Sequence, residues 1–334
     1  MKPVAMVGWS GSGRLDDLER TVAGRLDGGS AGPDRLGGVL VAGARDPVDA
    51  ARRLAHLPGV DWVAVGYRFS GTDGYLATLL QLAKRYVSRG VGFRVRAQSS
   101  GSRMSQGDLV LSGNSEVLAG IPGARVDERR PRARFRVCVE GSRGACGVEI
   151  VEGPGGTPTS QQWAACLVSG GERSSAMAWM AALSGYSVRL VHSASDDPAL
   201  RRVARLYAEL SRRMDPRCVE VIVLKGGGTP VGRLGSWLQG DAEVALAGLR
   251  PGRLAALTGL ASRFPNLAFP LLLVGDGAVK GAFGSLELGT PAGGRTRPAL
   301  TLEALRSGGS FTVTRFGGVE ADSNEVIDAL KRAT

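Results

Sequence analysis

Two stretches of this sequence carry arginines whose spacing could create a surface for an anion. ARVDERRPRARFR at residues 124–136 has six arginines and only two acidic residues. A little earlier, FRVRA at residues 93–97 places Arg94 and Arg96 two positions apart. Arginine carries five N–H donors in a planar fork that matches the geometry of a phosphate group. These stretches indicate a surface that binds a polyanion.

Period-two spacing predicts which arginines share a face. Successive side chains of a β-strand point to opposite faces, so arginines two residues apart project together while the residues between them, such as Phe135, face the core. Two basic strand faces in one small domain are typical of binding to a phosphate backbone. The alternative is a solvated, charged sheet face. The arginines expected on these faces are Arg94, Arg96, Arg132, Arg134 and Arg136.

A second kind of site is expected in SGGERSS, residues 169–175, between an apolar strand ending at Val168 and a helix starting near Ser174. Glycines let backbone N–H groups approach an anion, and a helix N-terminus adds partial positive charge. The pattern therefore predicts a phosphate-binding loop. An ordinary tight turn is the alternative, because such turns favour Gly and helix starts favour Ser.

A third candidate lies in LLLVGDGAVKGAFGSLE, residues 271–287, where Gly275 and Asp276 follow an apolar strand. Ligands of open parallel sheets sit beyond the carboxyl ends of the strands. Asp276 is thus a candidate to hold a metal or to position a nucleotide. The alternative is a turn-forming aspartate beside glycine.

The excess of positive charge is not spread evenly. The net charge is +11, and the 42 basic residues include five lysines, which leaves 37 arginines. Residues 1–66 are neutral overall, residues 67–165 carry +6 and residues 166–334 carry +5. A compositional bias toward arginine is the alternative explanation for the scarcity of lysine, whereas the uneven distribution favours a localised partner.

Other residue types exclude several classes of protein. Four cysteines without a CxxC pair, beside two histidines, argue against a disulfide scaffold and a His/Cys metal site, so the cysteines are expected to be buried apolar residues. No apolar run approaches the roughly 20 residues that span a bilayer, and the first residues do not resemble a signal peptide. A cytoplasmic protein without a membrane partner is expected.

Three units should position these residues. The first, up to residue 66, alternates strands and helices like a split βαβ, ferredoxin-like fold. The second ends in the Gly- and Pro-rich stretch 153–160, and the third alternates strands and helices like a parallel sheet. Strands are expected at 4–8, 37–43, 60–69, 93–97, 132–140, 145–152, 164–168, 187–192, 219–224 and 269–275, and helices at 15–26, 47–56, 72–88, 105–119, 174–184 and 196–213.

In this order the units resemble the tRNA 4-thiouridine synthetases, also called thiamine-biosynthesis-type tRNA sulfurtransferases. That family places a ferredoxin-like domain before a THUMP domain and an ATP-binding PP-loop domain. The resemblance covers nearly the whole chain and predicts an α/β and α+β multidomain fold with domains at 1–66, 67–160 and 161–334. It rests on LPGVDWVAVGYRF, FRVRAQSSGSR, VEIVEGPGGTP, LVSGGERS and LLLVGDGAVKGAFGSLE.

The resemblance also implies a function. The first two domains are expected to bind the acceptor region of tRNA. Enzymes of this type adenylate a uridine carbonyl oxygen with ATP and magnesium and then replace AMP by sulfur from a cysteine persulfide, so a sulfur-donor protein is a further expected partner. In this sequence Arg94, Arg96 and Arg103 match the basic part of the THUMP pattern, and Ser169, Gly170, Gly171 and Ser174 match the nucleotide loop, with Ser175 and Gly275 beside it.

One substitution separates this chain from the family pattern. The family loop reads SGGxDS, and its acidic position is occupied here by Arg173. An arginine removes a possible magnesium-binding carboxylate and could instead clamp a phosphate directly. Arg173 and Asp276 are therefore the candidate catalytic residues. The alternative is a catalytically degenerate homologue that binds tRNA without adenylating it.

Overall fold

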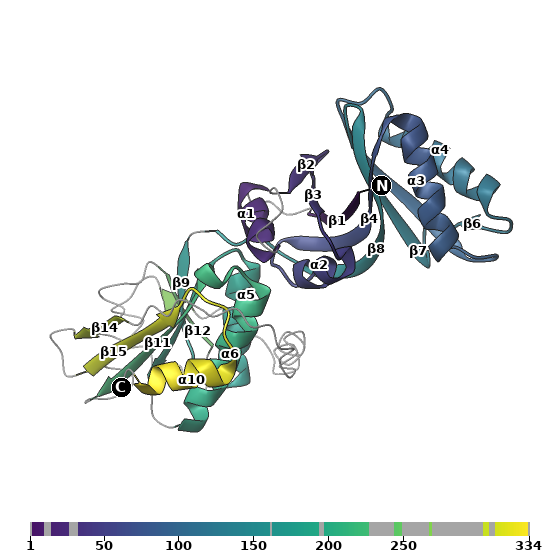
Figure 1. Cartoon of the computed structure of the whole chain (residues 1–334). Coiled ribbons are helices and arrows are strands. Elements are labelled where there is room, and N and C mark those ends of the chain that lie inside the picture. Colours follow the sequence, from purple (N-terminus) through teal and green to yellow (C-terminus); the bar gives the residue numbers. More distant parts are fainter. Residues whose placement is uncertain are drawn as a thin grey trace. The chain divides into compact units, whose positions relative to one another are not determined.

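A computed structural model describes residues 2–9, 15–26, 33–160, 162–193, 197–226, 244–248, 267–268, 303–306 and 311–332 (Figure 1). The chain divides into two compact units, Met1–Pro158 and Thr159–Thr334. None of the helices that the structure describes is long and apolar enough to cross a membrane.

The first unit is built on one eight-stranded sheet in the order β2-β3-β1-β4-β8-β7-β5-β6. Its strands are β1 (Pro3–Gly8), β2 (Asp34–Leu36), β3 (Val39–Gly43), β4 (Val60–Ser70), β5 (Gly92–Ser100), β6 (Arg125–Val126), β7 (Ala133–Glu140) and β8 (Arg143–Gly155). Its helices are α1 (Leu15–Arg25), α2 (Pro47–Leu54), α3 (Gly71–Tyr86) and α4 (Gln106–Gly120). Most of these elements begin and end within a few residues of the predicted ranges. The hairpin strand β2 and the short strand β6 were not predicted.

Strand β4 joins the two halves of this sheet. It pairs antiparallel with β1 on one side and with β8 on the other, and the predicted boundary at residue 66 falls inside it. Gly66 permits the close approach of β8, because a Cβ atom there would lie 1.9 Å from the backbone oxygen of Cys146. The sequence predicted a separate small sheet for the first 66 residues, whereas the structure continues that sheet into the next half.

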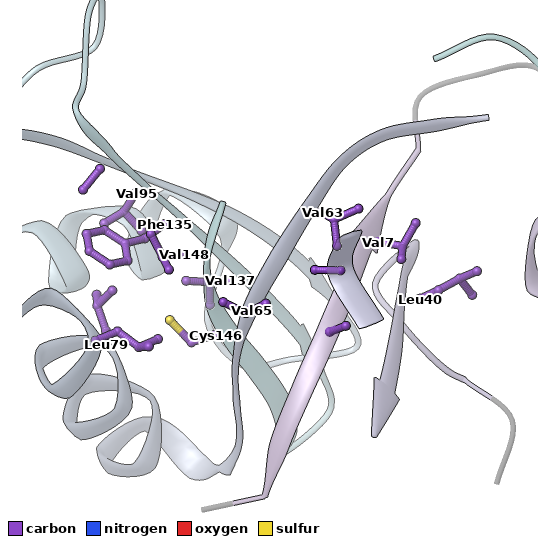
Figure 2. Packing of buried hydrophobic residues seen from close by; sticks show 14 of the residues in the cluster. Val7, Leu40, Val63, Val65, Leu79, Val95, Phe135, Val137, Cys146 and Val148 are labelled. Atoms are coloured by element: carbon purple, nitrogen blue, oxygen red, sulfur yellow. The ribbon is translucent and has the colours of Figure 1, made fainter. Parts of the chain in front are cut away.

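The four helices that the structure describes in the first unit pack on one face of its sheet. Buried residues from each of them, such as Leu18 of α1 and Leu79 of α3, belong to the same apolar cluster as the inward side chains of the strands. Figure 2 shows this cluster following the sheet, with Phe135 and Val95 near Leu79. A smaller apolar cluster, which includes Met6, lies on the opposite face. Strand side chains that alternate with those of the main core therefore point to the face opposite the helices.

The second unit contains a mixed sheet in the order β13-β12-β9-β10-β11-β15-β14. Strands β9, β10 and β11 run parallel as predicted. Strand β12, which was not predicted, is parallel to β9, and β15 adds antiparallel to β11. The strands are β9 (Trp163–Leu167), β10 (Ser187–Ser193), β11 (Val219–Gly226), β12 (Val244–Ala247), β13 (Leu267–Ala268), β14 (Glu303–Arg306) and β15 (Phe311–Gly317). The strand predicted at 269–275 lies outside the described residues.

Among the described residues of the second unit, three helices cover one face of this sheet. They are α5 (Glu172–Leu183), α6 (Asp197–Arg213) and α10 (Ser323–Arg332), and their buried residues share one core with β9, β10 and β11. Although α6 and α10 are far apart in the sequence, they lie side by side (Figure 1). The hydroxyl of Tyr207 donates a hydrogen bond of 2.6 Å to the backbone oxygen of Val319, which ties α6 to the connection between β15 and α10.

Candidate functional site

Strands β5 and β7 bring two pairs of arginines side by side. The strands are parallel neighbours, and their register sets Arg94 beside Arg134 and Arg96 beside Arg136. All four side chains alternate with core residues such as Phe135, so they project from the face that the helices leave open. We call Arg94, Arg96, Arg134 and Arg136 the sheet-face cluster. The predicted sharing of faces within each strand agrees with this register.

Two glutamates of β8 neutralise half of the sheet-face cluster. Glu149 lies 2.9 Å from Nη1 of Arg134 and 2.7 Å from Nη2 of Arg136, and its side chain is only 4% exposed. Glu152 forms a second ion pair with Arg134. Three residues apart, these glutamates would point to opposite faces of a regular strand. A register irregularity against β4, where Val63 pairs with residue 151 but the next residue pairs with Glu149, restores them to one face.

Arg136 is enclosed more than its neighbours. Its guanidinium carbon lies 4.3 Å from the ring centroid of Trp62 on β4, a cation–π contact, and its Nε donates to Glu149 at 2.8 Å. Burial lowers the pKa of Arg136, with Arg96 and Arg94 acting in the same direction against the attraction of Glu149. The pKa of Arg134 is raised by its hydrogen bonds to Glu152 and Glu149. Both guanidinium groups are thus committed to partners within the fold.

The remaining predicted arginines lie elsewhere. Arg132 precedes β7 instead of belonging to it, and its backbone N–H donates to the backbone oxygen of Gly92 at 2.8 Å. Arg103 is exposed in the segment between β5 and α4, beyond the opposite end of β5. The face predicted for Arg132, Arg134 and Arg136 is therefore one residue shorter than expected, and Arg103 is not part of it.

Sequence reasoning missed the residues that restrain the arginines. Trp62 and Glu149 lie on strands that are separated from β7 by turns, helices or both, and only the order of strands brings them together. Neither spacing nor composition marks Glu149, because the irregularity in β8 sets its direction. The one available signal was the presence of two acidic residues in an otherwise apolar strand sequence.

In the second unit, the glycine loop lies between β9 and α5, as predicted. Gly170 has φ +77°, and a Cβ atom there would lie 3.0 Å from the backbone oxygen of Ala199. Nε of Arg202, on α6, donates to the backbone oxygen of Gly170 at 3.0 Å. Gly171 is the residue that caps the N-terminus of α5. The left-handed backbone conformation and the contact with α6 explain why glycine suits position 170.

The two serines of this loop bond to the loop itself. The hydroxyls of Ser174 and Ser175 donate to the backbone oxygen of Gly171 at 2.9 and 3.1 Å. The backbone N–H of Ser169 donates to the Ser174 hydroxyl at 3.3 Å. Arg173 lies partly exposed in the first turn of α5. The structure thus brings Ser169, Gly170, Gly171, Arg173, Ser174 and Ser175 together, whereas Gly275 and Asp276 lie outside the described residues.

Sulfur chemistry would need an accessible thiolate. Cys138, Cys146 and Cys166 are buried, and burial raises the pKa of Cys138 and Cys166 to about 12 and that of Cys146 further. Cys218, just before β11, is partly exposed. Across the described ranges, no group of three or more His, Cys, Asp or Glu side chains is arranged to hold a metal ion.

Comparisons with known proteins identify relatives by structure alone. No protein-family model matches the chain, and no curated protein matches its sequence. PH1313 from Pyrococcus horikoshii Ot3 is similar in structure with a TM-score of 0.70 and 16% identity, over 85% of this chain and 99% of that one. A 4-thiouridine synthetase, solved in complex with RNA and with bound ATP, has a TM-score of 0.66 and 16% identity over 86% of each chain.

These similarities extend over both units of the chain. At 16% sequence identity they establish the fold and nothing beyond it. The predicted fold class is confirmed, with α+β elements preceding a parallel-sheet α/β domain. The boundaries at residues 66 and 160 stay predictions. The chain shares the multidomain architecture of PH1313 and of the 4-thiouridine synthetase.

Proposed function

We propose that this protein binds tRNA and takes part in tRNA modification of the 4-thiouridine type. The observation that carries the proposal is the likeness to a 4-thiouridine synthetase complexed with RNA over 86% of both chains. The arginines of residues 67–165, which give that stretch a net charge of +6, supply the attraction for a phosphate backbone. The first unit, which spans the ferredoxin-like and THUMP domains that the sequence predicts, would hold the RNA.

The glycine loop of the second unit is the proposed ATP site. ATP is bound in the solved 4-thiouridine synthetase, and the loop of this chain has the strand, glycine turn and helix start that a phosphate requires. Backbone N–H groups of residues 170–173 would face the phosphates. Arg173 would neutralise part of their charge, with Asp276 and magnesium as further expected participants. Bound ATP would supply the AMP group that activates a uridine oxygen for replacement by sulfur.

The sulfur atom would not be delivered by the buried cysteines of the two units. Three of the four thiols are buried with raised pKa values, which makes them poor nucleophiles at neutral pH. A sulfur-donor protein, with Cys218 as the accessible thiol of this chain, fits thiolation best. Modification of native protein by a thiol reagent should therefore reach Cys218 fastest.

A second candidate function is RNA binding without adenylation. It is favoured by Arg173, because a cation stands where the family pattern has an acid. The deciding measurement is ATP affinity, by calorimetry, for the wild type beside Arg173→Asp. Binding by the wild type with magnesium supports the enzyme. Absence of binding by the wild type together with its gain in Arg173→Asp supports the non-catalytic homologue.

The tRNA proposal itself is tested by wild-type affinity. Binding should weaken steeply as salt rises, because phosphate contacts release counterions. A wild-type chain that shows no affinity for tRNA at low salt contradicts the proposal, whatever its ATP affinity.

A further inference from the structure

A second group of arginines surrounds the point where β5 and β7 begin. Three connections meet there: the one from α3 to β5, the one from α4 to β6 and the one from β6 to β7. Of this group, only Arg132 was assigned from the sequence to a predicted strand face. We call it the strand-start cluster, and its members are Arg89, Arg125, Arg129, Arg130 and Arg132.

Backbone hydrogen bonds hold the three connections together. Gly90 donates to the backbone oxygen of Gly123 at 2.8 Å, and Arg132 donates to that of Gly92 at 2.8 Å. A Cβ atom at Gly123 would lie 2.7 Å from Cγ of Arg89, which places the Arg89 side chain over the end of α4. The arginines therefore project from a connected backbone frame, although they come from three separate segments.

Asp127 fixes the centre of this frame. Its Oδ1 accepts the backbone N–H groups of Arg130 at 2.9 Å and Arg129 at 3.1 Å, and its own N–H donates to the backbone oxygen of Phe93 at 2.8 Å. These bonds, that from Arg130 first, lower the pKa of Asp127 against the effect of burial, and the positive charges of Arg125 and Arg130 act in the same direction as the bonds. Because the carboxylate binds backbone N–H groups, it orients the two arginines without forming an ion pair with either side chain.

The guanidinium groups of the strand-start cluster are available to a partner. All five residues are exposed, and none of these side chains forms a hydrogen bond or an ion pair within the described part of the chain. Five positive charges stand against two negative ones, Asp127 and Glu128. In the sheet-face cluster, by contrast, Arg134 and Arg136 are ion-paired and Arg94 donates to the backbone oxygen of Glu128 at 3.1 Å.

We propose that the strand-start cluster is the main phosphate-binding surface of the first unit and takes a run of backbone phosphates of RNA. The inference rests on the proposed RNA binding and names the residues that provide it. Unpaired guanidinium groups can reach phosphates without first breaking an ion pair, and each such contact adds affinity that salt removes. The sheet-face cluster then serves mainly to hold β7 against β8.

The test is tRNA affinity of the full chain as a function of salt. The variant Arg125→Ala/Arg129→Ala/Arg130→Ala should bind about tenfold or more weakly, and its slope of log affinity against log salt should be smaller by about 2 to 3, since each phosphate contact contributes about 0.7 to 0.9. The matched control is Arg45→Ala/Arg52→Ala, which removes two exposed arginines beside and on α2. The control should keep the wild-type slope within about 0.5.

The possible outcomes separate this inference from the function on which it rests. No tRNA binding by the wild type refutes the proposed function. Wild-type binding together with an unchanged slope in the triple variant refutes the inference alone. If the triple variant retains tRNA but loses affinity for polyglutamate, the cluster serves an acidic protein segment and the inference is also wrong. Circular dichroism and the single variant Arg130→Ala check that lost affinity does not reflect lost folding.

Discussion

The sheet-face and strand-start clusters have similar numbers of arginines but differ in what surrounds them. On the sheet face, Glu149 and Trp62 enclose Arg136, and Arg134 has two carboxylate partners. At the strand starts, the carboxylate of Asp127 binds backbone N–H groups. The number of arginines in a region is therefore a poor measure of the charge that it presents. The position of the acidic side chains decides whether arginines stabilise the fold or remain available to a ligand.

The largest expected change in stability comes from removing the Glu149 side chain. Glu149→Ala leaves two guanidinium groups without their shared partner, one of them partly buried, and should lower local stability by about 2 to 4 kcal/mol after allowance for the exposure of Arg134. Hydrogen exchange at amides of β7 and β8 in the full chain measures it. Glu140→Ala, at an exposed position on the same sheet, should change exchange by less than about 0.5 kcal/mol. Equal effects of both variants would remove the structural role given to the sheet-face cluster.

A smaller loss of stability is expected when the Trp62 ring that contacts Arg136 is removed. Trp62→Leu keeps an apolar side chain but abolishes the cation–π contact, and should cost about 1 to 2 kcal/mol at the same amides. The matched control is Trp163→Leu, since Trp163 in the second unit lies 4.7 Å from the guanidinium of Arg189 in the same kind of contact. If Trp62→Leu lowered the hydrogen-exchange protection of β7 no more than Trp163→Leu does, the stabilising contact between Trp62 and Arg136 would be contradicted.

Acid should destabilise the turn at residues 127–130, in which Asp127 accepts the N–H groups of Arg129 and Arg130. The pKa of Asp127 is lowered in the folded chain, so its charge stabilises the turn above the unfolded value of about 3.9, and this contribution is lost as pH falls through the folded pKa. Amide chemical shifts of Arg129 and Arg130 should therefore report a titration below pH 4. The step should vanish in Asp127→Asn and persist in Glu128→Gln. Persistence in Asp127→Asn would assign it to another group.

The smallest expected effect is that of salt on the stability of the sheet-face cluster. The ion pairs of Glu149, whose side chain is 4% exposed, are shielded from ions in solution, whereas the strand-start arginines are exposed and strongly screened once the Debye length falls to about 3 Å at 1 M. Between roughly 0.05 and 1 M salt, amide protection in β7 should change little. A marked loss of that protection would show that the sheet-face ion pairs are as accessible as the strand-start arginines.

The sequence predicted local features well because local chemistry determines them. Asp46 and Pro47 mark the start of α2, where the Asp46 side chain accepts the N–H groups of Val48 and Asp49. Alternation of arginine with apolar residues gave the facing of β7 correctly, and the Gly-rich turn before α5 was placed where the structure has it. In each case the residues that decide the structure lie within a few positions of one another.

Features that depend on distant segments were not predictable in this way. The parallel pairing of β5 with β7 follows from strand order, and the ion pairs of Glu149 require both that order and an irregularity in β8. For the same reason the sequence treated Arg134 and Arg136 as available charges. The strand-start cluster needs three connections to converge, which no spacing within one of them reveals.

The continuity of β4 with β8 also determines how this protein can be cut. A fragment that begins at residue 67 would lose most of β4 and leave the hydrogen-bonding edge of β8, from Gly147 to Gly155, without its neighbour. Such an uncovered edge recruits strands from other molecules and promotes aggregation. A fragment ending at Pro158 keeps every pairing of the eight-stranded sheet. A fragment meant to contain the first unit should therefore retain the N-terminal strands in order to stay soluble.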